Sequence, residues 1–271
     1  MIVVTGAIGN VGGRLVALLA AAGERVTAVS RRDTEPPQGV RQVRADLGDP
    51  AGLKEAFDGA DALFLLVAGE APQAVVEAAR AGGIRRVVLL SSQGAGTRPE
   101  FYRHPAAFED AVRRSGLEWT ILRPGGFHSN AYAWAESIRG GRTAAAPFGD
   151  IGLPTVDPAD IAEVAAAVLR EDGHTGRVYE LTGPAPTTPR ERAAAIGAAL
   201  GEPVRFAEQT REEARAQMLG FMPERVAEGT LAILGEPLAA EQRVSPDVER
   251  VLGRAPRSFA DWAVRNVAAF R

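Results

Sequence analysis

The sequence contains no cysteine, and Lys54 is its only lysine. The absence of cysteine excludes disulfides, thiol nucleophiles and cysteine-ligated metals. The single lysine leaves one candidate for any reaction that requires a lysine amine. Aromatic residues make up only 6% of the chain, and no cluster of basic residues carries interleaved aromatics. Nucleic acid is therefore not expected as a partner.

Long hydrophobic runs are also missing. Because no stretch of about 18 apolar residues occurs, we expect no membrane-spanning segment. The first strand-like stretch begins at Ile2, which leaves no room for a signal peptide, so a cytoplasmic location is the expectation. The overall composition is typical of a folded domain, since 46% of the 271 residues are hydrophobic and 24% are charged, with a formal net charge of −3.

Short apolar runs alternate with helical patterns through the first 125 residues, which is typical of βαβ units in a parallel sheet. The strands are expected at residues 2–5, 25–30, 40–45, 62–67, 86–91 and 118–123. The helices are expected at residues 10–22, after Pro50, and at 72–81, 105–115, 158–169 and 189–200, with a further strand at 177–181. The pattern predicts an α/β fold with a Rossmann-type, doubly wound parallel sheet.

The alternation weakens past about residue 200 into a short strand and several helices. We therefore predict that residues 1–150 form a dinucleotide-binding domain, to which residues 151–200 add a strand and helices. Residues 201–271 are predicted to form a smaller, mostly helical substrate lobe over the edge of the sheet where ligands bind.

A glycine-rich stretch at residues 5–12 lies between the first predicted strand and the first helix. Its Gly-x-x-Gly-x-x-Gly spacing permits a tight turn, a close approach of the backbone to a pyrophosphate, and close packing of helix on strand. Free N–H groups at the helix start would bind the phosphates, although a plain glycine-rich turn is the alternative. The predicted cofactor contacts in this stretch are Thr5, Gly6, Ile8, Gly9, Asn10, Val11 and Gly12.

The second predicted strand ends in Ser30-Arg31-Arg32, where NAD-selective folds carry an acidic residue. An arginine fork can bind the 2′-phosphate of NADP(H), which a carboxylate would repel. We therefore favour NADP(H) over NAD(H), with no flavin and no metal, and two solvated surface arginines are the alternative. Further contacts are predicted at the ends of later strands, from Asp46, Leu47, Val67, Ala68, Ser91, Pro124, Gly125 and Phe127.

Over essentially its full length the chain resembles the atypical short-chain dehydrogenases/reductases of the NmrA-like, NAD(P)H-binding group. The matching stretches are residues 4–12, Glu109 with 115–125, 127–130, 160–162 and 179–184, and the Trp-Thr-Ile-Leu-Arg-Pro-Gly run at 119–125 is the most specific of them. The resemblance implies either a reductase of quinones, triphenylmethane dyes or azo dyes, or a catalytically silent NADP sensor.

The Tyr-x-x-x-Lys dyad of ordinary superfamily members is missing, because none of the three tyrosines is followed by lysine four residues later. The usual carbonyl–alcohol chemistry, in which lysine lowers the pKa of tyrosine, is therefore not expected. A quinone or a cationic dye needs less help from a general acid. We predict an NADPH-dependent reductase that transfers hydride directly to a quinone, a dye or an aromatic secondary metabolite. A non-catalytic NADP(H)-binding redox sensor is the alternative. The oligomeric state, monomer or homodimer, is left open.

Four residues are candidates to replace the dyad. Tyr102 and His104 lie just before the helix that normally carries it, whereas His128 and Asn130 follow the sixth predicted strand. His128 is a candidate proton donor near neutral pH, or a histidine that packs under the C-terminal lobe. The three histidines form no metal motif. Phe127, Tyr132 and Trp134 suit either the wall of a flat aromatic substrate pocket or an ordinary core.

Overall fold

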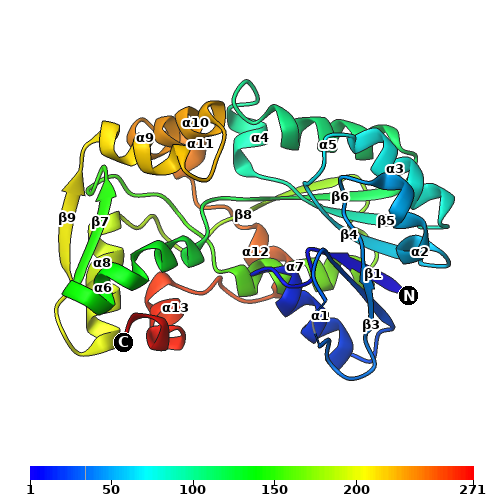
Figure 1. Ribbon diagram of the computed structural model, residues 1–271, viewed down its shortest axis with the longest axis horizontal. Helices are drawn as coiled ribbons and strands as arrows, with labels where there is room; N and C mark the ends of the chain where they lie inside the picture. The colour runs from blue at the N-terminus through cyan, green and yellow to red at the C-terminus, as the bar shows by residue number, and fades with distance from the viewer. Residues whose placement is uncertain (34) are drawn as a thin grey trace.

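Seven parallel strands form the main sheet of the computed structural model, which describes residues 1–33 and 35–271 (Figure 1). The strand order is β3-β2-β1-β4-β5-β6-β8. The strands are β1 Ile2–Thr5, β2 Val26–Ser30, β3 Arg41–Arg44, β4 Ala62–Leu66, β5 Arg86–Leu90, β6 Glu118–Pro124 and β8 Arg177–Leu181. The order reverses between β1 and β4, which is where doubly wound sheets bind ligands at the carboxyl ends of their strands. The predicted fold class is confirmed.

Helices cover both faces of this sheet, which explains why the central strands are almost entirely apolar. One face packs against α1 (Gly12–Ala21), α7 (Pro158–Arg170) and α12 (Asp247–Leu252). The other face packs against η1 (Pro50–Leu53), α2 (Lys54–Phe57), α3 (Pro72–Ala81) and α5 (Arg103–Arg114). Because β1, β2, β3 and β4 run parallel, the loops that follow them lie at one edge of the sheet.

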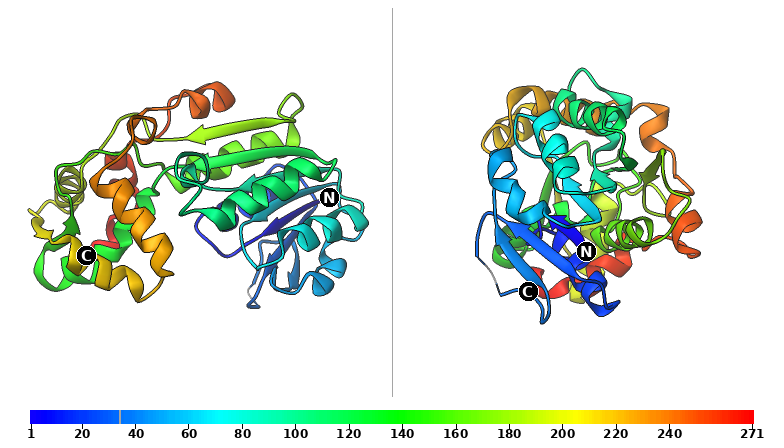
Figure 2. Two further views of the ribbon diagram at one scale, coloured as in Figure 1. Left: turned by 90° about the horizontal axis from the view of Figure 1, so that it is seen from above. Right: turned by 90° about the vertical axis from the view of Figure 1, so that its right-hand side faces the viewer.

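A second, smaller core lies beside the sheet, as the two views of Figure 2 show. Its two-stranded parallel sheet pairs β7 (Thr143–Pro147) with β9 (Arg205–Gln209), and we did not predict β7. The surrounding helices are η2 His128–Trp134, α6 Ala135–Gly141, α8 Pro189–Leu200, α13 Phe259–Arg265 and η3 Val267–Phe270. These elements come from both sides of the predicted boundary at residue 200. The division into domains stays a prediction.

Ion pairs fasten the last quarter of the chain to α4 and α7. Arg98, which follows α4 (Gln93–Thr97), donates to Glu241 Oε1 at 2.9 Å, and this pair holds α11 (Ala239–Gln242) against α4. The helices α9 (Arg211–Leu219) and α10 (Glu224–Gly235) lie next to them (Figure 1). Arg254 donates to Asp160 at 2.7 Å, which ties the segment before α13 to α7.

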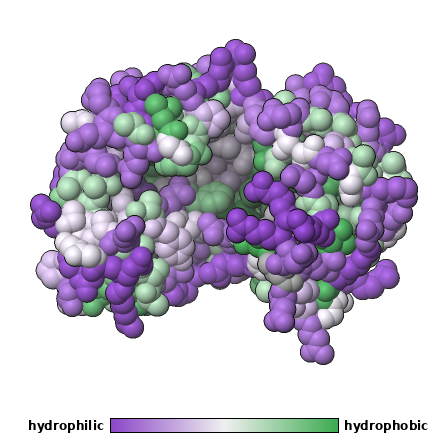
Figure 3. Space-filling model, in the orientation of Figure 1, coloured by the Kyte–Doolittle hydropathy of each residue, from purple (hydrophilic) through white to green (hydrophobic). Residues whose placement is uncertain are grey.

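Between the two lobes the surface is hollowed, and the floor of the hollow is pale to weakly hydrophobic (Figure 3). It lies beside the carboxyl ends of the sheet strands. Within the part of the chain that the structure describes, no helix is long and apolar enough to span a membrane.

Candidate cofactor and substrate site

The glycine loop is a tight turn that only glycine fits at two positions. Gly6 has a φ of +63°, a left-handed conformation that side chains other than glycine rarely adopt. A Cβ atom at Gly12 would lie 2.2 Å from the carbonyl oxygen of Gly6. The first turn of α1 therefore packs directly on the end of β1, as the spacing of the glycines predicts.

The amide groups of this loop are available to a ligand. Gly9 donates its N–H to Gly6 O at 2.9 Å, whereas the N–H groups of Ile8, Asn10 and Val11 have no acceptor among residues 1–33 and 35–271. They precede the positive end of the α1 dipole, which adds to their attraction for an anion. The loop thus has the donor set that a pyrophosphate requires.

A cavity of about 360 Å³ opens beside the loop at the carboxyl ends of β1 to β4. Ten of the predicted cofactor residues line it: Thr5, Gly6, Ile8, Gly9, Ser30, Arg31, Arg32, Asp46, Leu47 and Ala68. Sequence analysis missed Val29, Ala45, Leu66 and Gly69, which also line it. A glycine shortly after a buried strand was the available signal for Gly69, whose added Cβ would lie 2.4 Å from the carbonyl oxygen of Leu47.

Two exposed arginines stand at the end of β2 on the wall of this cavity. Neither Arg31 nor Arg32 forms an ion pair within the described chain, so both guanidinium groups can accept an anionic ligand. The turn beneath them is held by Ser30, whose hydroxyl donates to Arg32 O at 2.5 Å. Across the cavity, Asp46 Oδ1 accepts the N–H of Gly48 at 2.9 Å, which fixes the Asp46 carboxylate.

The remaining predicted cofactor residues do not line this cavity: Asn10, Val11, Gly12, Val67, Ser91, Pro124, Gly125 and Phe127. Several of these residues are buried or form hydrogen bonds with other side chains. Val11 and Gly12 are buried, and Asn10 donates to Ser129 Oγ at 3.1 Å. Ser91 donates to Glu109 Oε1 at 2.6 Å. For these residues a cofactor contact stays a prediction.

The predicted proton donor His128 is enclosed by the second lobe. Its side chain is only 2% exposed, its Nδ1 lies 2.9 Å from Thr155 Oγ1, and its ring meets that of Phe259 edge-on. Burial lowers the pKa of His128 to about 4, so the imidazole is neutral near pH 7. This placement argues against the predicted role as proton donor near neutral pH, and it matches the alternative, packing under the C-terminal segment.

The structure does not bring the other catalytic candidates together. Tyr102 places its hydroxyl 3.3 Å from Thr230 Oγ1 on α10, and burial raises the pKa of this phenol. His104 is exposed, with Nε2 2.5 Å from the carbonyl oxygen of Gly69 at the rim of the cavity. Asn130 is exposed on η2. Catalytic roles for these three residues stay predictions.

A buried cluster links α5 to the carboxyl ends of β5 and β6. Arg123 donates to both oxygens of Glu109, at 2.9 and 2.6 Å, and Ser91 donates to the same carboxylate. Burial alone would raise the pKa of Glu109, but the hydrogen bonds from Arg123 and Ser91 lower it below its ordinary value. The carboxylate therefore stays ionised and acts as a structural acceptor.

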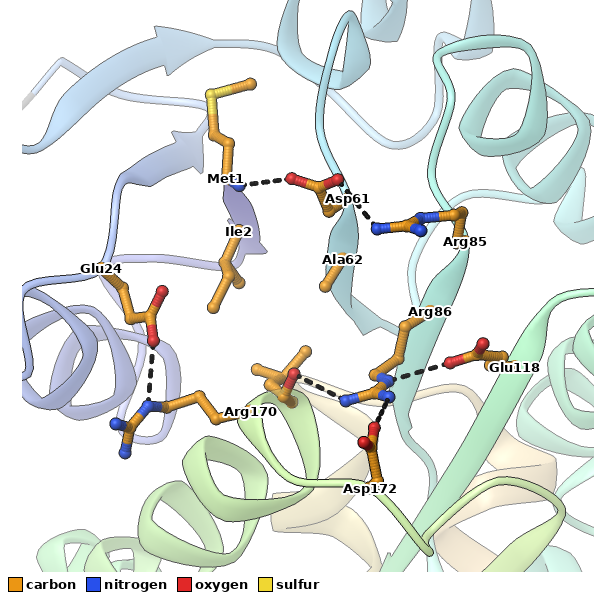
Figure 4. Close-up of a pocket in the computed structure, with 11 residues that line it drawn as sticks. Met1, Ile2, Glu24, Asp61, Ala62, Arg85, Arg86, Glu118, Arg170 and Asp172 are labelled. Atoms are coloured by element: carbon orange, nitrogen blue, oxygen red, sulfur yellow. Dashed lines mark hydrogen bonds and ion pairs between the residues drawn. The ribbon is translucent and has the colours of Figure 1, made fainter.

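A second cavity, of about 450 Å³, opens at the opposite edge of the sheet, where the strands begin (Figure 4). Its charged side chains neutralise one another. Arg86 pairs with Glu118 at 3.2 Å and with Asp172 at 2.7 Å, and Asp61 pairs with the amino group of Met1 at 2.7 Å. Since parallel sheets bind ligands at the carboxyl ends of their strands, we place the functional site at the other edge. Within the described residues, no cluster of three or more metal-ligating side chains occurs.

Comparison with known proteins identifies the class that this fold and loop define. Residues 6–172 match the family model described as NAD(P)H-binding. The chain is 38% identical to (4-alkanoyl-5-oxo-2,5-dihydrofuran-3-yl)methyl phosphate reductase of Streptomyces griseus, over 100% of this chain and 99% of that protein. It is 33% identical, over the same shares, to NAD(P)H azoreductase of Xenophilus azovorans.

Solved structures agree with these matches. The NADPH complex of quinone oxidoreductase QOR2 from Escherichia coli superposes with a TM-score of 0.81 and 25% identity, covering 98% of this chain and 99% of that one. The fold is that of a Rossmann-type dinucleotide-binding protein. The chain belongs to the NmrA-like, NAD(P)H-binding family of atypical short-chain dehydrogenases/reductases, and it is an NAD(P)H-binding oxidoreductase.

Proposed function

We propose that this protein is an NADPH-dependent reductase that passes hydride directly to a small, flat, electron-poor acceptor such as a quinone, a dye or an aromatic secondary metabolite. The observation that carries the proposal is the cavity of about 360 Å³, which joins the glycine loop to the exposed Arg31 and Arg32. The amides of Ile8, Asn10 and Val11 would bind the pyrophosphate. Arg31 or Arg32 would bind the 2′-phosphate, and Asp46 and Leu47 would contact the adenine end.

The cofactor, when bound, would supply the hydride, and a quinone or an azo dye would take up one proton in addition, whereas a cationic dye would take up none. Since His128 is neutral and enclosed, and since no tyrosine in the sequence is followed by lysine four residues later, we assign the proton to solvent. The hollow between the lobes is open enough to admit water and has a floor that suits an apolar ring (Figure 3). Such an arrangement favours acceptors whose developing charge is delocalised.

The Streptomyces griseus reductase, to which this chain is 38% identical, adds a further class of acceptor to test. Its name describes a lactone ring whose carbon–carbon double bond is conjugated to two carbonyl groups and which carries a phosphate ester. A doubly activated alkene of this kind accepts hydride readily, as a quinone does. Conjugated lactones therefore belong in the screen beside quinones and dyes.

The experiment is a titration with NADPH and NADH followed by a screen of NADPH oxidation against quinones, azo dyes and conjugated lactones. Tighter binding of NADPH together with turnover of at least one acceptor class supports the proposal. Tight NADPH binding with no turnover of any acceptor contradicts it and favours the redox-sensor alternative. A wild type that prefers NADH contradicts the assignment of the two arginines.

A further inference from the structure

Two of the loops that line the cofactor cavity touch each other at Gly69. The loop after β3 contributes Asp46 and Leu47 to the lining, and the loop after β4 contributes Ala68 and Gly69. Gly69 has a φ of +80°, and a Cβ atom added to it would lie 2.4 Å from the carbonyl oxygen of Leu47. The backbones of the two loops therefore pack directly on each other. We call these four residues the loop wall of the cavity.

The carbonyl oxygen of Gly69 is bound by a side chain from α5. His104 Nε2 lies 2.5 Å from this oxygen, and since a carbonyl oxygen can only accept, Nε2 carries the hydrogen that is donated. His104 is in the first turn of α5, 35 residues later in the chain than Gly69. It is not among the described residues that line the cavity, so its effect on the cofactor site passes through Gly69.

The imidazole of His104 is held in place although the residue is exposed. Its ring meets the ring of Phe108 edge-on, with the centroids 5.3 Å apart, and Phe108 is fully buried one turn later on α5. The residue before this helix is fixed as well. The ring of Tyr102 packs on Gly94 of α4, where an added Cβ would lie 2.6 Å from it. The donor that binds Gly69 is therefore presented by a well-anchored helix start.

The hydrogen bond from His104 orders the loop wall before a ligand arrives. A wall that is already ordered binds more tightly, because the entropy of ordering the loop is not lost at the moment of binding. The proposed function places Asp46 and Leu47 at the adenine end of the dinucleotide. Since Gly69 packs on Leu47, a change at His104 should be felt at that end of the cofactor.

We infer that His104 is a positioning residue for the dinucleotide, which holds the loop wall in the shape that receives the adenine end. The inference rests on the proposed function, from which it takes the placement of the cofactor in the cavity. It assigns to His104 a role in cofactor affinity and no proton transfer. Loss of its N–H donor should therefore weaken cofactor binding and leave the rate of hydride transfer at saturating cofactor unaltered.

The test compares H104A with H104Q. The amide nitrogen of glutamine can replace Nε2 as a donor, whereas glutamine cannot act as a general acid. In H104A we expect the Kd and the KM for NADPH to rise by about 3- to 10-fold, the cost of one hydrogen bond, with no change in kcat. H104Q should restore the affinity of the wild type. A fall in kcat in both variants with an unchanged KM for NADPH would overturn the inference and identify His104 as a proton donor.

H174A is the matched control. His174 also forms one hydrogen bond through its ring, from Nδ1 to the Tyr179 hydroxyl at 2.7 Å, but it lies just before β8 begins, at the opposite edge of the sheet. H174A should leave the Kd for NADPH at the wild-type value. A loss of affinity in H174A as large as that in H104A would contradict a specific role for His104. A loss in H104A that H104Q does not restore would contradict it as well.

A binding arm does not depend on turnover. Adenosine 2′,5′-bisphosphate carries the adenine end of the cofactor and no nicotinamide, so its Kd should rise in H104A by the same factor as that of NADPH. An unchanged Kd for this fragment would overturn the inference. H104N holds its amide nearer the backbone, should behave as H104A does, and takes its place if H104A does not fold. If these affinities change as expected but no acceptor is reduced, only the reductase function is contradicted.

Discussion

Ser91 Oγ donates a 2.6 Å hydrogen bond to Oε1 of Glu109, which joins the carboxyl end of β5 to the middle of α5. By the resemblance in sequence, α5 is the helix on which the missing tyrosine–lysine dyad is expected. Here it presents a carboxylate that is 1% exposed and bound by Arg123 from β6. The ion pair between Glu109 and Arg123 therefore links α5 to β6.

Glu109→Gln should destabilise the protein, because it leaves the partly buried Arg123 without its counterion. Removal of one member of such a pair costs about 3–5 kcal/mol. Urea unfolding followed by circular dichroism measures the loss. Glu118→Gln is the control, since Glu118 pairs with Arg86 at the surface and should change stability by at most about 1 kcal/mol. Equal stability of both variants would contradict this account of the cluster.

Arg31→Ala or Arg32→Ala should weaken the binding of NADPH and leave the binding of NADH unchanged. Either guanidinium can bind the 2′-phosphate, which only NADPH carries, and loss of that contact should cost about 10- to 100-fold in affinity. Fluorescence titration with both cofactors measures the difference. Arg25→Ala, at the start of the same strand and the opposite edge of the sheet, should change neither affinity. Unchanged NADPH affinity in both variants, singly and combined, would refute the NADPH assignment.

The two glycines of the loop should respond differently to substitution. Gly9 is exposed, and an added Cβ meets only Gly6 O at 3.2 Å, so Gly9→Val should fold and lose dinucleotide binding because its side chain stands where the pyrophosphate approaches. Gly12→Ala forces a contact of 2.2 Å with that same carbonyl oxygen and should lower the Tm. Tm and NADPH affinity, measured on both variants, separate the effects. Retained binding in Gly9→Val would place the cofactor elsewhere.

The sheet and the cofactor cavity could be predicted from sequence because local signals carry them. Apolar strands, short loops and a glycine spacing are readable within a few residues, and ten predicted contacts meet in one cavity. The second lobe could not be predicted in this way. Its strand β7 is the run Thr-Ala-Ala-Ala-Pro, which has little strand propensity and is held by pairing with β9 some 60 residues later in the chain, Thr143 with Arg205.

Local sequence patterns also could not predict the environment of His128. Its partners are Thr155 and the carbonyl oxygen of Arg257, the latter contributed from far along the chain. Sequence proximity to the sixth strand suggested a catalytic role, but burial by Phe259 and its neighbours decides the protonation state.

His128 should make stability depend on pH between about 4 and 6.5. Its pKa falls from 6.5 to about 4 on folding, so the unfolded state binds the extra proton in this range and stability falls as pH falls. The full effect is about 3 kcal/mol. Urea unfolding at several pH values should show a loss toward pH 4 that is smaller by this amount in His128→Gln. Parallel pH curves for the two proteins would show that His128 is not titrated by unfolding.

Hydride transfer, rather than protonation, should limit the rate at which a quinone is reduced. Tyr102 has its hydroxyl beside Thr230, and burial raises its pKa although Thr230 and Arg98 act in the opposite direction, so the phenol is a weak acid. Tyr102→Phe should therefore slow single-turnover reduction by far less than the roughly 10²- to 10⁴-fold that follows loss of a general acid. NADPH deuterated at the transferred position should slow the same step in both proteins.

Tyr132→Phe is the matched control for that measurement, because its hydroxyl donates to Asn266 within the second lobe at 2.7 Å. Both phenylalanine variants should retain the isotope effect, since removal of a hydroxyl that transfers no proton leaves the hydride step unchanged. If the rate of single-turnover reduction falls by roughly 10²- to 10⁴-fold in Tyr102→Phe but not in Tyr132→Phe, Tyr102 is the proton donor. A group other than lysine would then have to lower the pKa of Tyr102. The positive charge of Arg98 acts in this direction.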